Sequence, residues 1–166
     1  MDAFAELGAV ADHYASLPVE EAFTWGSVAD ALEPGEWYMV AFRSILRADA
    51  NVERLHRYDD WAHEEASTAD GFVHYFKGPL ASDRSCLSFC LWNSRTEARI
   101  AAARPAHQDA VTLIAESYEA YTLEFLTLRK MAGATALEFE AYGSTSGRRG
   151  TRSPRPAQLG FKPAPS

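Results

Sequence analysis

Residues 36–131 alternate between the two hydrophobic patterns that distinguish strands from helices. Runs rich in aromatic and β-branched residues predict four strands, at residues 37–46, 72–77, 86–92 and 121–129. Stripes with helical spacing predict two helical stretches, at residues 49–67 and 95–120, the second interrupted by Pro105. This β-α-β-β-α-β order predicts an α+β, ferredoxin-like domain, in which two helices cover one face of a four-stranded antiparallel sheet.

Three segments flank this domain. Residues 1–35 form an extension with a helical signal from Ala3 to Leu17, and residues 132–142 are suited to an extra strand or an arm. Residues 143–166 are rich in Gly, Ser, Pro and Arg, and this composition predicts disorder. The tail carries five basic and no acidic residues, so the remainder of this chain of net charge −7 is strongly acidic.

The two faces of the predicted sheet are both too apolar to lie in water. On the strand at 86–92, Leu87, Phe89 and Leu91 are expected to face the helices, which leaves the Cys86, Ser88, Cys90 and Trp92 set opposite. A second copy packed sheet to sheet would bury that opposite face and close a dimeric α+β barrel. The enclosed cavity would suit a small hydrophobic molecule. The sequence therefore predicts a homodimer.

Composition narrows the classes of partner and compartment. No apolar run approaches the roughly 20 residues that span a bilayer, and the acidic N-terminus lacks the pattern of a secretory signal, so a soluble cytoplasmic protein with no membrane partner is expected. An acidic body argues against nucleic acid as a partner. Cys86 and Cys90 lie four residues apart on one strand, roughly 13 Å, which is too far for a disulfide, so both are expected to be free thiols.

Three residues are candidates for catalysis. Arg43 lies on an otherwise apolar strand and needs an acceptor, either an internal carboxylate such as Glu124 or an oxyanion of a substrate. His107 follows Pro105 in the first turn of the restarted helix, where the helix dipole favours a neutral imidazole. His74 is suited either to the core or to a role as general base.

Four aromatic residues are candidates for substrate binding. Tyr75 lies next to His74 on one strand, so only one of the two can face the cavity, and the sequence does not decide which. Trp92, Tyr118 and Tyr121 can stack on a planar substrate or donate hydrogen bonds to it, although each also suits ordinary packing. Asp59 and His63 have the i, i+4 spacing of a metal pair, but the sequence offers no third ligand, so no metal site is predicted.

The strand order, the run Ser88-Phe89-Cys90-Leu91-Trp92-Asn93-Ser94 and the later Ala101-Ala102-Ala103-Arg104-Pro105-Ala106-His107 resemble the dimeric α+β barrel superfamily. Within it they are most similar to the antibiotic-biosynthesis-monooxygenase-like proteins. The resemblance implies a small biosynthetic enzyme that holds a hydrophobic, aromatic or polyketide-like substrate and acts as a cofactor-independent monooxygenase or a cyclase. In that role His74 or His107 would be the base and Arg43 would stabilise an oxyanion.

Two alternatives remain at this stage. One is a heme-binding protein in which His107 or His63 is the axial ligand. Heme-degrading members of the superfamily pair that histidine with an Asn on the first strand, and residues 37–46 contain no Asn. The other alternative is a non-catalytic binding or scaffold dimer, for which the N-terminal extension and the basic tail leave room.

Overall fold

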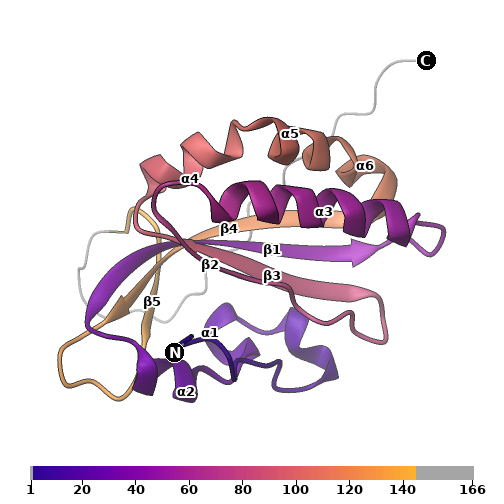
Figure 1. Ribbon diagram of the computed structural model, residues 1–166. Coiled ribbons are helices and arrows are strands. Elements are labelled where there is room, and N and C mark those ends of the chain that lie inside the picture. The colour runs from indigo at the N-terminus through magenta and orange to yellow at the C-terminus, as the bar shows by residue number, and fades with distance from the viewer. Residues whose placement is uncertain (1, 145–166) are drawn as a thin grey trace.

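The computed structural model describes residues 2–144 as three layers, with a sheet between a layer of helices and an N-terminal layer (Figure 1). The disorder predicted for the basic tail concerns residues that lie almost wholly outside this described range. No helix within residues 2–144 is both long and apolar enough to cross a membrane.

The sheet has five strands rather than the four predicted. They are β1 (Gly35–Leu46), β2 (Phe72–Phe76), β3 (Ser85–Trp92), β4 (Tyr118–Lys130) and β5 (Glu138–Ala141). The strand order is β2-β3-β1-β4-β5, and every neighbouring pair is antiparallel. The first four strands have the ferredoxin-like arrangement that the sequence predicts. The fifth pairs with the outer edge of β4 and comes from the segment 132–142.

The helices between the strands lie on one face of the sheet (Figure 1). They are α3 (Val52–Ser67), α4 (Arg95–Ala102), α5 (Pro105–Thr112) and α6 (Ile114–Ser117). Asn51 and Ser94 cap α3 and α4, because their side chains accept backbone N–H groups of the first turns. The helix predicted to run to residue 120 ends earlier, since the backbone already pairs as β4 from Tyr118 onwards.

The N-terminal segment, residues 2–31, does not form the predicted helix from Ala3 to Leu17. It folds instead as short pieces: η1 (Asp12–Ser16), α1 (Val19–Ala22) and α2 (Trp25–Ala31). Pro18 separates the first two of these pieces. Such short helices are not stable alone and depend on tertiary packing.

The N-terminal segment packs on the face of the sheet opposite the helices. Its buried side chains form one core with strand residues that are fully or almost fully buried, and these are Met39, Ala41, Leu87, Phe89, Leu91, Leu126 and Leu128. The expected face assignment for β3 is therefore wrong: Leu87, Phe89 and Leu91 face the N-terminal segment, and Cys86, Ser88, Cys90 and Trp92 face the helices.

The physical reason for a sheet-to-sheet dimer, that one apolar face of the sheet needs a cover, does not apply to this structure. A second copy was needed to bury an apolar face, and the chain buries that face with its own residues 2–31. The cavity expected on that side is likewise absent from the part of the chain that the structure describes, because aromatic side chains fill the space. Phe23 alone lies 5.1–5.7 Å, ring centroid to ring centroid, from four other rings.

Candidate functional site

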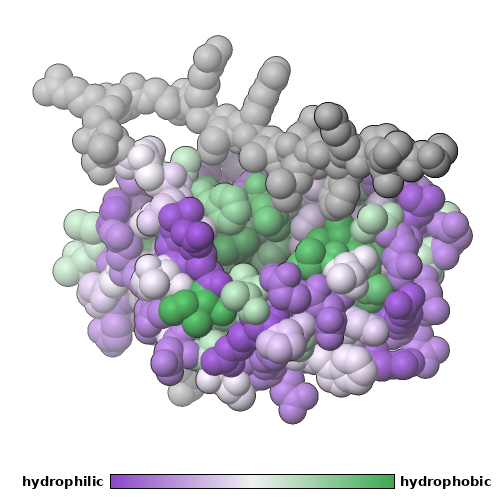
Figure 2. Space-filling view, turned by 90° about the horizontal axis from the view of Figure 1, so that it is seen from above, coloured by the Kyte–Doolittle hydropathy of each residue, from purple (hydrophilic) through white to green (hydrophobic). Residues whose placement is uncertain are grey.

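A cavity of about 660 Å³ lies inside the chain, between the sheet and the helix layer. Each strand from β1 to β4 contributes its helix-facing side chains to the cavity floor, and α3, α4 and α5 form its roof. Aromatic and aliphatic side chains make up most of the lining, and they include Tyr38, Val40, Phe42, Leu55, Phe72, Val111, Ile114, Leu123 and Phe125. Figure 2 shows the helix side from above, where hydrophobic residues gather in the middle and hydrophilic residues surround them.

Small side chains on the helices leave room for this cavity. The helix residues that line it include six alanines, which are Ala62, Ala66, Ala98, Ala101, Ala102 and Ala110. Neither α3 nor α5 has a single buried residue, although each forms part of the roof. The roof therefore rests on the floor mainly at one end, where Tyr38 and Trp92 pack against Ala98 and Ala101.

Two thiols and two serine hydroxyls lie on the floor of the cavity, those of Cys86, Cys90, Ser44 and Ser88. Cys86 and Cys90 are free, as predicted. Burial raises the pKa of the Cys90 thiol to about 12, so this side chain is a neutral thiol and not a nucleophilic thiolate. The Trp92 indole donates a hydrogen bond to the Cys90 sulfur, with 3.1 Å between Nε1 and Sγ, which fixes the Trp92 ring against the floor.

His107 lies in the roof, at the first turn of α5, and lines the cavity. Its helix begins there because the Glu65 carboxylate accepts the backbone N–H groups of Ala106 and His107. Burial lowers the pKa of His107, and the nearby Glu65 opposes that shift only in part. The imidazole is thus neutral at neutral pH and is able to accept a proton.

Three tyrosines lie together at the cavity, as side chains of β2 and β4. The Tyr75 hydroxyl hydrogen-bonds Asp59 of α3, and the rings of Tyr118 and Tyr121 lie 5.3 Å apart. Burial raises the pKa of Tyr118 to about 12 and also raises the pKa of Tyr121 and Tyr75. All three hydroxyls therefore stay protonated at neutral pH.

Comparisons with known proteins match one family model over most of the chain and solved structures over little more than half of it. The family model described as PB2B2.08-like matches residues 1–141, which is the N-terminal segment together with the sheet and the helix layer. The chain belongs to the PB2B2.08-like family. No curated protein matches it.

Several solved structures resemble this PB2B2.08-like chain over a little more than half of its length. One is SnoaB, a cofactor-independent oxygenase from Streptomyces nogalater, with 16% identity over 56% of this chain and 90% of that one and a TM-score of 0.43. Another is Rv0793 from Mycobacterium tuberculosis, with 17% identity, 57% and 95% coverage and a TM-score of 0.47. A third is a protein from Nitrosomonas europaea assigned as an antibiotic biosynthesis monooxygenase, with 10% identity, 57% and 90% coverage and a TM-score of 0.47. These proteins are of the kind that the sequence resembles, as predicted, and likeness at this level says nothing about substrate or residue roles.

The structure brings five of the seven predicted site residues together. His107, Trp92, Tyr75, Tyr118 and Tyr121 all line the cavity of this PB2B2.08-like protein. The sequence left open whether His74 or Tyr75 faces the cavity, and in the structure Tyr75 does. Sequence reasoning missed Asp59 as a partner of Tyr75. The spacing that suggested a metal pair with His63 was the signal available.

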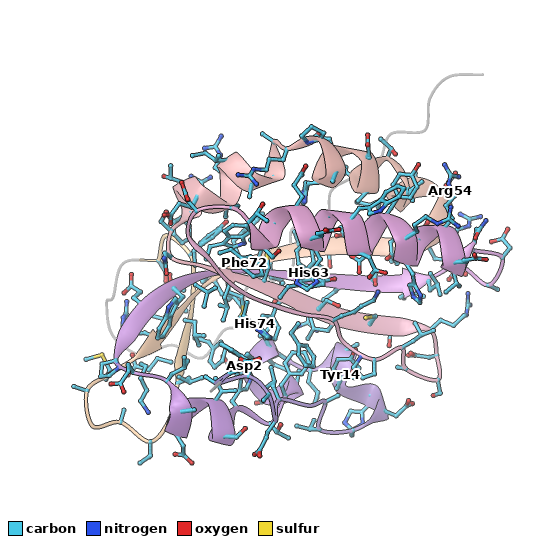
Figure 3. The ribbon with its side chains drawn as sticks, in the orientation of Figure 1. Asp2, Tyr14, Arg54, His63, Phe72 and His74 are labelled. Atoms are coloured by element: carbon cyan, nitrogen blue, oxygen red, sulfur yellow. The ribbon has the colours of Figure 1, made fainter. Side chains whose placement is uncertain are left out.

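His74 faces the N-terminal segment instead of the cavity. Its ring stacks on Phe4 with 4.2 Å between centroids, and burial lowers its pKa. Figure 3 shows His63 beneath α3 and His74 below the sheet, towards the N-terminal segment. A role for His74 as the base stays an untested prediction, and it would require chemistry on the opposite face of the sheet from the cavity.

Arg43 also lies on that opposite face. Its guanidinium pairs with Glu124 and donates to the Ala15 carbonyl oxygen at the end of η1, with 2.6 Å between Nη1 and O. Of the two acceptors that the sequence allowed, the structure supplies the internal carboxylate. Arg43 thereby fastens the N-terminal segment to the sheet, and Lys130 does the same by donating to the Ala29 carbonyl oxygen of α2.

We expect Arg43→Met to lower the free energy of unfolding by about 2 kcal/mol, since it leaves the half-buried Glu124 without its partner. Both side chains of this pair are only 18% exposed. Arg54→Met is the matched control, because the Arg54–Glu116 pair is 47% and 55% exposed, and we expect it to cost less than about 1 kcal/mol. Urea unfolding followed by tryptophan fluorescence measures both. Equal costs for the two variants would contradict the anchoring role.

No group of three or more His, Cys, Asp or Glu side chains within residues 2–144 is arranged to hold a metal ion. The two residues with i, i+4 spacing, Asp59 and His63, make other contacts. Asp59 accepts a hydrogen bond from the Tyr75 hydroxyl and pairs with the Lys77 ammonium group. His63 lies with its ring 4.8 Å from that of Tyr75. The cavity edge at α3 is thus a hydrogen-bonded cluster.

Proposed function

We propose that this protein is a small enzyme that binds a hydrophobic, ring-containing molecule in the cavity between the sheet and the helix layer. The observation that carries this is the cavity itself, since a mostly apolar space of about 660 Å³ lies within the range typical of small-molecule sites, roughly 300 to 1,000 Å³. Aromatic side chains on the floor are suited to stacking on a planar ring. Polar groups on the floor, such as Ser88, and in the roof, such as His107, can orient the ligand.

The reaction that best suits these groups is proton abstraction followed by chemistry of the resulting anion. Neutral His107 would accept a proton from an acidic O–H or C–H group of the ligand. The electron-rich anion would then react with dioxygen, so that one ring carbon becomes a carbonyl and the second oxygen atom leaves as water with the two hydrogens which the ligand loses, or it would close a ring on its own carbonyl group. These are the cofactor-independent monooxygenase and cyclase types of chemistry. The protonated hydroxyls of Tyr118 and Tyr121 would donate hydrogen bonds to developing negative charge.

Isothermal titration calorimetry with 1-naphthol tests the site. We expect 1-naphthol to bind the wild-type protein, and Ala110→Phe to weaken binding by tenfold or more because the larger side chain projects into the cavity. Ala115→Phe is the control, since Ala115 is exposed and does not line the cavity, and we expect it to leave the affinity unchanged. Absence of binding, or equal effects of both variants, would overturn the proposed site.

Two further readouts bear on the chemistry. In His107→Asn we expect 1-naphthol binding to persist while oxygen uptake or ring closure on a reactive ligand falls by about 100-fold or more. Titration with hemin addresses the alternative: a Soret band that disappears in His107→Asn would favour heme binding over the enzyme proposed here.

A further inference from the structure

At the polar edge of the cavity, a hydrogen bond joins strand β2 to helix α3. Tyr75 projects from β2 and Asp59 from α3, and the Tyr75 hydroxyl oxygen lies 3.1 and 3.3 Å from the two carboxylate oxygens of Asp59. Lys77, two residues along β2, lies 3.0 Å from Asp59 through its ammonium nitrogen. Asp59 and Tyr75 are partly buried, whereas Lys77 is exposed at the rim.

The hydrogen bond between Tyr75 and Asp59 can have only one donor. A carboxylate carries no hydrogen, so the Tyr75 hydroxyl must be the donor and Asp59 the acceptor. Burial, and after it the negative charge of Asp59, raises the pKa of Tyr75, so the phenol keeps its proton at neutral pH. The Lys77 ammonium group also pairs with the Asp59 carboxylate. The oxygen of Tyr75 therefore presents only lone pairs to any further partner.

Nothing else within residues 2–144 donates a hydrogen bond to this oxygen. The Tyr75 side chain nevertheless lines the cavity, together with Phe72 and Cys90. His63 contacts the Tyr75 ring from the α3 side, with 4.8 Å between centroids. A ligand that fills the cavity would thus meet a hydrogen-bond acceptor with no protein donor to satisfy it.

We infer that the Tyr75 oxygen, oriented by Asp59, accepts a hydrogen bond from a hydroxyl group of the ligand, so the cavity selects hydroxylated rings over their methyl ethers. This inference rests on the proposed function. A ligand hydroxyl replaces the water that the oxygen loses on binding, whereas a methoxy group has no proton to give and leaves the acceptor unsatisfied. The difference of one hydrogen bond in a partly buried site corresponds to about tenfold in affinity.

Binding of 1-naphthol and 1-methoxynaphthalene, measured by calorimetry on the same protein, tests the inference. We expect the wild type to prefer 1-naphthol by about tenfold. Tyr75→Phe removes the acceptor, so the preference falls to within about twofold while the affinity for the ether is kept. In Asp59→Asn the side-chain amide is able to donate to Tyr75, which releases the tyrosine proton for the ligand, and we expect the ether to gain relative to the naphthol.

Asp60→Asn is the matched control, since it makes the same chemical change at an exposed position of α3 outside the cavity lining, and we expect the tenfold preference to remain. Because the readout is a ratio of two ligands on one protein, a general loss of stability does not imitate the expected result. Binding of neither ligand by the wild type would overturn the proposed function itself. Equal binding of both, or a preference that survives Tyr75→Phe, would overturn only the role of Tyr75.

Discussion

Replacing Phe23 by Ala is expected to lower the free energy of unfolding by about 3 to 5 kcal/mol, the range for removal of a buried aromatic ring. Phe23 is 3% exposed and lies at the centre of the contact between the N-terminal segment and the sheet. Its ring contacts two rings of its own segment, Tyr14 and Trp25, and two rings of the sheet, Phe76 and Phe89. The truncation leaves a cavity between two layers that neither side can close, because the sheet is held by its own hydrogen bonds.

Urea unfolding of the Phe23→Ala variant measures this loss, and Val10→Ala is the control. Val10 belongs to the same segment but is 46% exposed, so we expect its truncation to change stability by less than about 0.5 kcal/mol. A single unfolding transition in both proteins is expected, since the segment and the sheet share one core. A small effect of Phe23→Ala, or a separate early transition, would show instead that residues 2–31 are a loosely attached extension.

The local patterns of the sequence predicted the strands and their order well. Each strand from β1 to β4 has its own run of aromatic and β-branched residues, and such runs depend little on the rest of the fold. The N-terminal segment was not predictable in this way. Its aromatic residues follow no helical or strand period, and its helices are only four to seven residues long, so their stability comes from contacts with the sheet.

The alternation of side chains along β3 was not sufficient to assign its two faces to the two neighbouring layers. A period of two divides β3 into two sets of side chains but does not state which set faces which layer. The more apolar set, with Leu87 and Phe89, faces the N-terminal segment, and the smaller, more polar set, with Cys86 and Ser88, faces the cavity. Arg43 lies opposite Leu87 in the β1–β3 register and shares its face, so it points away from the cavity. The dimer was expected because neither face of the sheet could lie in water, and residues 2–31 bury the face that a second copy would have covered.

The alanines of the helix layer were visible in the sequence and point to the cavity. A roof of small side chains over a floor of large aromatic ones is an unusual way to pack two layers, since cores are ordinarily filled to high density. In this protein Ala62 and Ala110, on different helices, both face the cavity. Read together with the polar side chains on the same helix faces, they would have indicated a cavity on the helix side.

The junction between β2 and β3 depends on Gly78, where the backbone comes very close to a neighbouring strand. A Cβ atom at Gly78 would overlap the Leu87 carbonyl oxygen and the Tyr14 hydroxyl. Tyr14 reaches this point from the N-terminal segment, where its hydroxyl donates to the Pro79 carbonyl oxygen and accepts the Leu87 N–H. The Gly78 N–H donates to the Ser88 hydroxyl, with 3.0 Å between N and Oγ. The N-terminal segment, the strand end and the cavity floor thus meet at one glycine.

Gly78→Ala is therefore expected to lower the free energy of unfolding by about 3 kcal/mol, the upper part of the range for overpacking, because a backbone carbonyl cannot turn aside as a flexible side chain does. Gly26→Ala is the matched control: a Cβ there meets no atom within 4 Å, and the position lies inside α2. Alanine stiffens the unfolded chain at that position, so we expect Gly26→Ala to stabilise the protein by about 0.5 to 1 kcal/mol. Thermal and urea unfolding of the two variants would give shifts of opposite sign. Shifts of the same sign would contradict the close approach at Gly78, and with it the attachment of Tyr14 to the sheet edge.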